Sequence, residues 1–526
     1  MSWTVQDAAE KPVGHISNRV NNLRKKEGER KKIMELLNKE MTHAVDRPVR
    51  VAQFGEGNFL RAFVDYMVDI ANEKGLFDGS VVLIRPIPFG DMDKFFLDQD
   101  CQYTLQLRGR VEGEPYVETR QITSIANIVS PFRDYEEYIN VAKIDTLRFV
   151  VSNTTEAGIV FNAEDKFEEK LNITFPAKLT QFLLTRYETF NGDPDKGLVM
   201  LPVELIDDNG IELRKCVMKY IDLWNLDAGF KSWVENACIF TSTLVDRIVT
   251  GYPRADAEKI WNELGYRDNI LDTAEPFALW VIESEKDISK EWPMDQALAD
   301  KTGMNVIFTD NQKPYKQRKV RILNGAHTSF VLASYLKGND FVNQSMQDPI
   351  MQDFMMKTIH EEVIPTLTLP KADLEEFANA VVDRFNNPFI QHSLLAIALN
   401  SVSKWKARCL PSFLGYVEKF GKLPEHLTFS IASLMAFYSA TELADGALKG
   451  HRGDDVYDIK DDQAVLEFFR DNSAKETGEF VHAYLSNEAF HGQDLTKIEG
   501  LEAKVTEYLG AIRSEGMEKA LVKYFG

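Results

Sequence analysis

The chain has 526 residues, of which 44% are hydrophobic and 27% charged, and it carries a formal net charge of −20 at pH 7. This composition is typical of a folded globular protein with roughly two to four domains. The acidic balance excludes a general nucleic-acid or anionic-membrane binder, because neutralising phosphates requires clustered Lys and Arg. It still permits an anionic small molecule in a local basic pocket.

The cysteines and the apolar segments of the sequence indicate in which cellular compartment the protein is expected. The four cysteines are scattered without a Cys-x-x-Cys pair, which predicts buried thiols in a reducing environment and neither a disulfide framework nor a zinc site. No apolar segment is long enough for a signal peptide or a membrane span. We therefore expect a soluble cytoplasmic protein with no membrane partner, and the sequence leaves its oligomeric state open.

Residues 1–45 read as a polar extension, in which residues 21–38 predict a charged amphipathic helix. Order is expected to begin with the β-rich stretch 49–54. A glycine-containing turn, a helical period and a second β-rich stretch at 80–84 follow. Strand, turn, helix and strand in this order predict a βαβ unit.

The glycine turn after the first strand has a physical purpose. Gly55 permits a tight turn, Gly57 lets backbone N–H groups approach an anion, and the helix that follows favours a pyrophosphate at its N-terminus. Leu60 stands where a third glycine is usual; two glycines alone are a weak signal, which the flanking strand and helix strengthen. We predict a dinucleotide site that includes Phe54, Gly55, Gly57, Asn58 and Phe59.

Two further strand ends carry candidate cofactor contacts. The second strand ends in Arg85, with no acid where a ribose-binding Asp or Glu is expected. This arginine could stack on adenine or pair with a 2′-phosphate, so NAD and NADP both stay open. The stretch 148–152 predicts another strand, and Asn153 and Thr155 follow it in a polar turn. Open α/β sheets bind ligands at such strand ends, with an ordinary Thr-capped turn as the alternative.

Strands are also expected at 103–108 and 198–205, with loops at 191–197 and 302–310. From about residue 315 the strand signals fade, and helical periods occupy 351–364, 374–385, 394–406, 427–438, 464–469 and 501–508. We therefore predict an α/β fold. A Rossmann-type dinucleotide-binding domain would span residues 46–300, and a mostly α-helical substrate domain would span residues 301–526.

The helix expected over residues 319–327 carries three groups of complementary chemistry. At about 100° per residue, Asn324 and His327 lie roughly 60° apart and Lys319 roughly 80° beyond His327, so all three can face one cleft. A buried lysine can have its pKa lowered enough to act as a base near neutral pH. Asn324 offers an N–H to a carbonyl oxygen, and His327 can hold a second hydroxyl. From spacing alone, a solvated basic helix start with one core histidine is the commoner interpretation.

Other catalytic chemistries have little support. The nine histidines are dispersed without an H-E-x-x-H motif, which argues against a metal centre. No G-x-S-x-G elbow is present for nucleophilic hydrolysis. On general grounds Asp246 and Arg247 predict a structural ion pair, although Asp246 close to Lys319 could instead orient or tune that amine.

Five stretches, taken as a set, resemble the long-chain, metal-independent polyol dehydrogenase family, to which mannitol dehydrogenases and hexuronate reductases belong. They are residues 53–63, 152–158, 242–248, 319–327 and 384–388, and they occur in the family's order. The resemblance implies a Rossmann-type part followed by a helical domain, with NAD as the cofactor.

The same resemblance implies roles for individual side chains. Lys319 would exchange the proton of the reacting hydroxyl, and Asn324 would stabilise its oxygen as charge develops. His327 would bind a neighbouring hydroxyl. Asp246 would sit by the lysine and the nicotinamide, which supplies the hydride.

Two departures argue for a branch of this family other than the mannitol enzymes. Glu204-Leu205 stands where those enzymes carry Asp-Asn, and Thr250 stands where Pro or Ser is preferred. The resemblance is greater to the hexuronate reductases, whose substrate carboxylate requires a cation. The candidates are Arg384, His392, Lys404, Lys406 and Arg408.

We expect an oxidoreductase that interconverts a keto-hexuronate and a hexonate. A mannitol-type polyol dehydrogenase is one alternative, and a non-redox protein that keeps the fold to sense nucleotides is another.

Overall fold

The computed structural model describes residues 34–85, 87–155, 157–171 and 173–526. Most of the helix predicted at 21–38 lies outside these residues. Its last part is not helical: Leu36 forms an isolated bridge with Arg267, and the short helix α2 (Lys39–Thr42) begins only after Asn38, which caps it. The prediction is wrong for residues 34–38, because backbone pairing with a distant loop replaces the local helical pattern.

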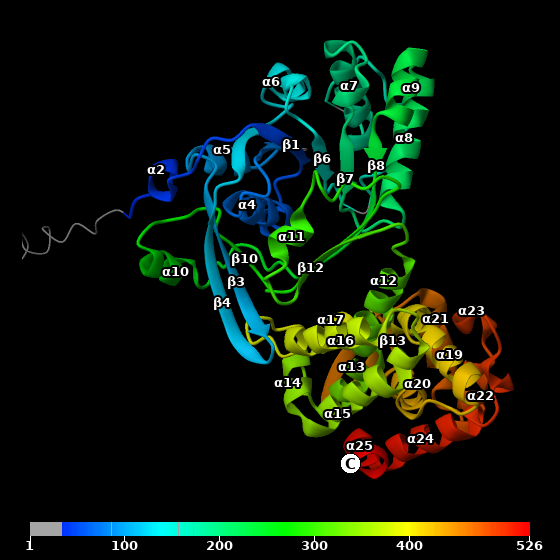
Figure 1. Cartoon of the computed structure of the whole chain (residues 1–526). Coiled ribbons are helices and arrows are strands. Elements are labelled where there is room, and N and C mark those ends of the chain that lie inside the picture. The colour runs from blue at the N-terminus through cyan, green and yellow to red at the C-terminus, as the bar shows by residue number, and fades with distance from the viewer. Residues whose placement is uncertain (1–33, 86, 156, 172) are drawn as a thin grey trace, which may run out of the picture.

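The first half of the described chain is built on a six-stranded parallel sheet with the order β5-β2-β1-β6-β7-β8 (Figure 1). Its strands are β1 (Val49–Phe54), β2 (Ser80–Ile84), β5 (Ile125–Val129), β6 (Phe149–Ser152), β7 (Val199–Pro202) and β8 (Ile239–Phe240). β1 pairs with β2 on one side and with β6 on the other, so the strand order reverses beside β1. Such a switch point forms the ligand crevice at the carboxyl ends of the strands. The strands predicted at 49–54, 80–84 and 148–152 are confirmed, and that predicted at 198–205 is shorter.

Helices cover both faces of this sheet. Val51 packs into the core that contains α3 (Asn58–Leu60), η1 (Arg61–Asp65) and α4 (Tyr66–Glu73). Its neighbour Ala52 packs into the core that contains α7 (Phe175–Thr189), α8 (Asn209–Leu223) and α9 (Ala228–Asn236). Because successive strand residues face opposite sides, a strand buried on both sides reads as the continuous apolar run seen here. The short helix α5 (Met92–Leu97) contributes Phe96 to the first of these cores, and α6 (Tyr135–Asn140) contributes Tyr138 to the second.

Two three-stranded sheets extend the first half, with the orders β10-β3-β4 and β12-β11-β9. Their strands are β3 (Tyr103–Val111), β4 (Glu114–Ile122), β9 (Ser242–Asp246), β10 (Asp272–Ala274), β11 (Ala278–Glu283) and β12 (Met304–Thr309), and the helices α10 (Ala257–Leu264) and α11 (Met294–Leu298) lie between them in the chain. The loop predicted at 302–310 is wrong, because β12 occupies it and pairs in parallel with β11. Met304 and Val306 are buried in the core of that half, and this tertiary burial fixes the strand.

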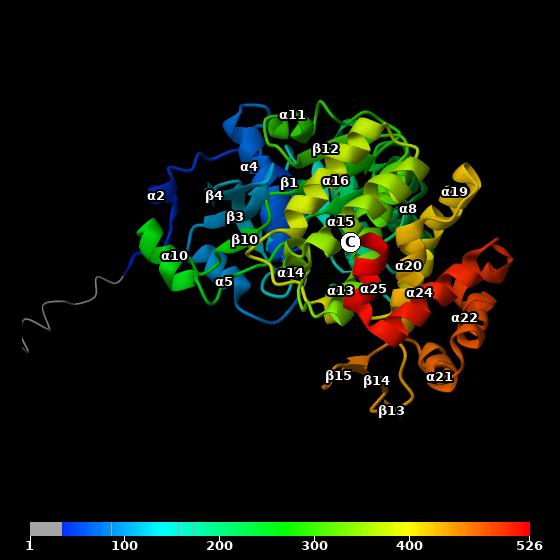
Figure 2. The ribbon, with the colours of Figure 1, turned by 90° about the horizontal axis from the view of Figure 1, so that it is seen from below.

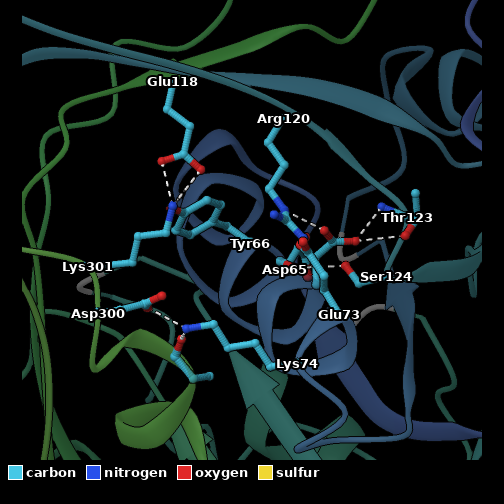
Figure 3. A network of polar contacts seen from close by, with 12 residues as sticks. Asp65, Tyr66, Glu73, Lys74, Glu118, Arg120, Thr123, Ser124, Asp300 and Lys301 are labelled. Carbon is cyan, nitrogen blue, oxygen red and sulfur yellow. Dashed lines mark hydrogen bonds and ion pairs between the residues drawn. The ribbon is translucent and has the colours of Figure 1, made fainter.

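A polar network fastens the β3–β4 hairpin to α4 (Figure 3). The Asp69 carboxylate accepts hydrogen bonds from Arg120 Nε at 2.6 Å and from the Thr123 backbone N–H at 2.8 Å. Lys301 Nζ lies 3.0 Å from both carboxylate oxygens of Glu118. These contacts hold the long hairpin in place, so that its turn reaches the helical half (Figure 1).

The second half is mostly helical and is organised around α13, whose side chains are buried on nearly every face. Its helices are α12 (Lys313–Arg318), η4 (Lys319–Asn324), α13 (Gly325–Lys337), α14 (Val342–Gln347), α15 (Pro349–Lys357), η5 (Thr358–Val363), α16 (Lys371–Phe385), α17 (Leu394–Ile397), α18 (Ser401–Arg408), α19 (Leu410–Phe420), α20 (Glu425–Phe437), α21 (Gln463–Asn472), α22 (Thr477–Leu485), α23 (Glu488–His491), α24 (Leu501–Glu515) and α25 (Met517–Phe525). The helical ranges expected from the sequence are confirmed, except that a turn at residues 398–400 divides the range 394–406 into α17 and α18. One small antiparallel sheet, β13 (Leu443–Ala444), β14 (Ala447–Arg452) and β15 (Asp455–Ile459), lies at the edge of this half (Figure 2).

All four cysteines are free and buried, as the sequence predicts. Within the described ranges, no helix combines the length and the apolar character that crossing a membrane requires.

Candidate active site

The glycine turn has the geometry expected of a phosphate-binding loop. Gly55 has φ +127, and a Cβ there would meet Leu60 Cδ1 at 3.0 Å and the Asn153 carbonyl oxygen at 3.3 Å, so glycine is required. A Cβ at Gly57 would meet no atom within 4 Å. The helix beginning at Asn58 has no side-chain cap. Its first N–H groups therefore face an open space, which suits an anion.

The other residues expected at the cofactor divide into two groups. Asn153 continues β6 beside the turn, where its N–H donates to the Phe54 carbonyl at 3.1 Å, and Thr155 is exposed with φ +92. The Phe54 side chain, in contrast, packs against Phe175 inside the core, with the ring centroids 5.1 Å apart. Phe54 can offer a ligand only its backbone. Phe59 is half-buried and stacks on Phe63.

Glu204, one of the departures noted in the sequence, is buried and holds the end of β6. Its carboxylate accepts hydrogen bonds from the Thr154 N–H at 3.1 Å, the Thr154 hydroxyl at 3.0 Å and the Ser152 hydroxyl at 3.1 Å. Burial raises the pKa of this carboxyl above its ordinary value. Glu204 thus supports the turn that contains Asn153.

Arg85 is committed to its own loop. It is only 5% exposed, and its guanidinium donates to Asp93 at 2.8 Å and to the Gly90 carbonyl at 2.8 Å, with Glu56 3.5 Å away. The sequence left this arginine available for a 2′-phosphate. In the structure two carboxylates already match its charge, so it is not a free cation.

The three residues singled out on the helix over 319–327 line one cavity of about 390 Å³. Lys319, Asn324 and His327 share its wall with Asp246 and Ile248 from the first half. The remaining lining residues are Leu323, Val342, Arg384, Phe385, Ile390, His392, Ala396, Ile397, Lys404 and Arg408. The cavity therefore lies between the two halves, as expected for an interdomain site.

The helix itself differs from expectation, because residues 319–324 form a π-helical segment, η4, between α12 and α13. In a regular α-helix Lys319 and Asn324 would point about 140° apart. Hydrogen bonding from i to i+5 widens the turn and brings side chains five positions apart closer to one face. The irregularity thus helps Lys319 share a wall with Asn324.

Lys319 is held at the end of β9. Its Nζ donates to the Val245 carbonyl at 2.9 Å and lies 3.8 Å from Asp246 Oδ1. Burial lowers the pKa of the ammonium below its ordinary value, while Asp246 opposes this shift and Arg384 adds to it. The amine can therefore exchange a proton at a lower pH than a solvated lysine.

Asp246 and Arg384 form the electrostatic centre of the site. Arg384 is buried and donates to both oxygens of Asp246 at 3.0 Å, and it lies 2.9 Å from Glu275. Burial alone would raise the pKa of Asp246, but Arg384 and Lys319 hold it below its ordinary value. The expectation that Arg384 binds a substrate carboxylate is wrong, since two protein carboxylates already occupy its guanidinium.

The ion pair expected between Asp246 and Arg247 is also wrong. The Arg247 side chain points the other way and donates to the Ala62 carbonyl at 2.7 Å and to the Glu275 carbonyl at 3.0 Å. Ala62 belongs to the helix that follows the glycine turn, and Gly251 lies against the Asn58 side chain. The loop after β9 thus links the Lys319 cavity to the dinucleotide turn.

His327 is half-buried and stacks against Phe385, with ring centroids 4.2 Å apart, and its Nε2 has no hydrogen-bond partner in the described part of the chain. Burial lowers the pKa of this imidazole well below its ordinary value, and His392 and nearby cations add to the effect. His327 is therefore neutral and can offer Nε2 to a ligand hydroxyl.

Lys404 and Arg408 supply positive charge to the same cavity. Lys404 Nζ donates to the Ile397 carbonyl at 2.9 Å, and Arg408 Nη1 donates to the Thr328 hydroxyl at 3.3 Å. Within the part of the chain that the structure describes, neither side chain forms an ion pair with a carboxylate. Lys406, on the same helix, is not part of the lining.

Glu275 and Val245 are contacts that the sequence did not reveal. Glu275 follows β10 in a stretch without any motif, and Val245 acts through its backbone carbonyl. Only the fold brings them to Lys319 and Arg384.

Both halves match models of one family. Residues 49–296 match the mannitol dehydrogenase Rossmann domain, and residues 311–513 match the mannitol dehydrogenase C-terminal domain. The chain belongs to the mannitol dehydrogenase family. As a member, it is an oxidoreductase that acts on a CH–OH group and uses a nicotinamide cofactor.

Curated members of the mannitol dehydrogenase family resemble this chain over nearly its whole length. An altronate oxidoreductase of Yersinia enterocolitica is 44% identical over 498 residues, covering 93% of this chain and 100% of that protein. An altronate oxidoreductase of Escherichia coli is 43% identical over 495 residues, covering 93% and 99%.

Solved structures of the family share the fold. A substrate-free D-sorbitol dehydrogenase superposes with a TM-score of 0.76 at 19% identity, over 92% of this chain and 100% of that chain. The mannitol 2-dehydrogenase of Pseudomonas fluorescens, in a ternary complex with NAD and D-mannitol, has a TM-score of 0.60 at 22% identity, over 93% and 99%.

Proposed function

We propose that the protein is an NAD-dependent tagaturonate reductase, which interconverts D-altronate and D-tagaturonate. The observation that carries the proposal is the pair Lys404 and Arg408, two cations without a carboxylate partner in the described chain, in the same cavity as Lys319. A neutral polyol offers such cations only hydroxyl oxygens, whereas a uronate offers a carboxylate, which forms stronger charge-assisted hydrogen bonds. The altronate oxidoreductases among the relatives fit this chemistry.

The dinucleotide turn fits a pyrophosphate through the open space at Gly57 and the uncapped N–H groups that follow it. Asn153 and Thr155 border the turn at the end of β6. A nicotinamide held here would supply the acceptor for the hydride that leaves the substrate carbon. NAD is favoured over NADP, because Arg85 is paired with Asp93 and Glu56 and has no charge left for a 2′-phosphate.

In the oxidation direction, neutral Lys319 takes the proton of the reacting hydroxyl while the hydride leaves its carbon. The Asn324 amide donates to the oxygen as its charge develops, and His327 Nε2 binds a neighbouring hydroxyl. Asp246 and Arg384 position the lysine and set its pKa. In the reduction direction the same ammonium returns the proton to the oxygen of the keto group.

The first test is the rate of NADH and NADPH consumption with tagaturonate, fructuronate and fructose. We expect the highest kcat/KM with tagaturonate and NADH. A higher value with fructuronate would make the protein a fructuronate reductase, and a higher value with fructose would make it a mannitol-type dehydrogenase. Turnover with none of the three would support the nucleotide-sensing alternative.

The second test separates recognition of the carboxylate from the chemistry. Lys404→Gln or Arg408→Gln should lower kcat/KM for tagaturonate by about 10- to 100-fold, since a hydrogen bond to a charged group contributes roughly 1.5–3 kcal/mol. Activity with a neutral ketose should not fall. Lys406→Gln, on the same helix but outside the cavity, is the matched control. Equal losses with charged and neutral substrates would remove the two cations from carboxylate recognition.

A further inference from the structure

A second cavity, of about 470 Å³, lies beside the reaction site. The turn of the β3–β4 hairpin, the β11–β12 sheet, α12 and α16 contribute to its wall. Among the residues described, Arg384 alone lines both cavities, and Glu275, its ion-pair partner, lines this one. The two spaces are therefore distinct, and the Arg384 side chain separates them.

Arg318 is the unusual residue in this wall. It is 6% exposed, and its guanidinium carbon lies 4.5 Å from the ring centroid of Phe377 and 5.4 Å from that of Tyr315. Its Nε is buried without a hydrogen-bond partner, and no carboxylate or carbonyl pairs with its guanidinium among the residues described. Stacking on aromatic rings satisfies the faces of the guanidinium but not its N–H donors.

Other buried arginines of the described chain donate to protein partners, although Arg61, Arg85 and Arg247 each keep one nitrogen without a partner. Arg186 donates to four backbone carbonyls, at distances from 2.7 to 3.0 Å, and Arg384 is paired with two carboxylates. A buried charge without a partner is energetically unfavourable. The cavity at Arg318 thus holds an unsatisfied donor group that a ligand can complete.

The walls define the shape of that ligand. Phe277, Phe377 and Tyr315 supply apolar surface around Arg318. Four carboxylates besides Glu275 line the cavity. Glu112, Asp373 and Glu376 are exposed at its rim, where water screens their charge, and the half-buried Asp383 accepts a hydrogen bond from the Gly113 N–H. A volume of this size suits a small organic molecule, whose anionic group would lie at the buried arginine and whose ring would lie between the aromatic side chains.

We propose that this cavity is a second ligand site, which binds a small organic carboxylate with an apolar body through Arg318. Arg318 presents a planar fork of donors that matches a carboxylate in two parallel hydrogen bonds. Because Arg318 precedes Lys319 in the chain and Arg384 borders both spaces, a ligand here lies next to the reaction site without entering it.

The test uses the full chain saturated with NAD and measures binding of 4-fluorobenzoate by ¹⁹F NMR, with 4-fluorobenzyl alcohol as the neutral isostere. The wild type should bind the carboxylate about tenfold or more tightly than the alcohol, as expected for a charge-assisted pair. Arg318→Met, which keeps the stacking volume, should abolish the preference, and Arg318→Lys should retain part of it. Circular dichroism and the Tm verify that each variant is folded.

A double variant, Lys404→Gln with Arg408→Gln, keeps this cavity intact and removes the free cations of the reaction site. It should bind 4-fluorobenzoate like the wild type. Binding that disappears in the double variant, or that persists unchanged in Arg318→Met, would overturn the proposal, as would a wild type without preference for the carboxylate. The readout is binding, so it stands independently of which substrate the enzyme turns over.

Discussion

At the residue scale, the proposed chemistry depends on a lysine whose pKa is set by burial and by its charged neighbours. Burial lowers the pKa of Lys319, Asp246 raises it and Arg384 lowers it. A base must be neutral to accept a proton, so kcat/KM for altronate oxidation should rise with pH and level off below the pH at which a solvated lysine titrates.

Asp246→Asn removes the anion that raises the Lys319 pKa, so the ascending limb of the oxidation profile should move to lower pH. The measurement is kcat/KM against pH for the wild type and the variant. Lys319→Ala should lose turnover by about 10²-fold or more and retain cofactor binding. An ascending limb at the same pH in Asp246→Asn as in the wild type would contradict the role of Asp246. A Lys319→Ala enzyme that keeps most of its kcat would contradict the role of Lys319.

Asp65 is a second titrating residue, buried beside Gln53 in the dinucleotide half. Burial raises the pKa of its carboxyl from 3.8 to about 8. The folded state therefore keeps a proton that the unfolded chain releases, so stability falls as the pH rises from about 4 to about 8.

Asp65→Asn removes this titration. The free energy of unfolding of the variant, relative to that of the wild type, should therefore be higher at pH 8 than at pH 5. Urea midpoints at the two pH values measure the effect. Asp300→Asn, at an exposed position, is the control and should show no such gain. An Asp65→Asn variant with the wild-type pH dependence would show that the carboxyl is already ionised.

At the element scale, the sequence predicted those helices and strands that are determined by residues close together in the chain. The β1–turn–α4–β2 unit follows from a short apolar run, two glycines and a helical period. β12 was missed because alternation in a six-residue stretch is weak until β11 pairs with it. Arg384 was assigned to the substrate because the sequence cannot show that Asp246, 138 positions away, occupies it. The π-helical segment at Lys319 likewise has no local signal in the sequence.

Close packing between α8 and β9 gives an element-scale prediction. A Cβ added at Gly210 would overlap the Thr241 carbonyl oxygen. Gly210→Ala should destabilise the protein by about 1–3 kcal/mol, the range for overpacking. Gly510→Ala, in α24 with nothing within 4 Å of the added Cβ, should stabilise by about 0.5–1 kcal/mol. Urea midpoints that change in the same direction from the wild-type value in both variants would contradict this packing.

At the scale of the whole molecule, a buried ion-pair cluster crosses between the halves. Arg384 comes from α16, and its partners Asp246 and Glu275 come from the first half. Arg384→Met would leave Glu275 without a cationic partner and Asp246 with Lys319 alone, and should destabilise the fold by about 3–5 kcal/mol. Lys215→Gln, which breaks an exposed pair within α8, is the control. A Tm for Arg384→Met equal to that of the wild type would refute this role.

The β3–β4 hairpin has a consequence for how the molecule moves. Its turn reaches α16, where the Gly113 N–H donates to Asp383 at 3.0 Å and the Arg108 carbonyl accepts from Asn387 at 3.1 Å. These hydrogen bonds connect the two halves at the tip of the hairpin, in addition to the chain segment that leads from β12 to α12. With these anchorages and the Arg384 ion-pair cluster, a hinge has little freedom to swing. Substrate entry would then proceed by side-chain rearrangement at the mouth of the cavity.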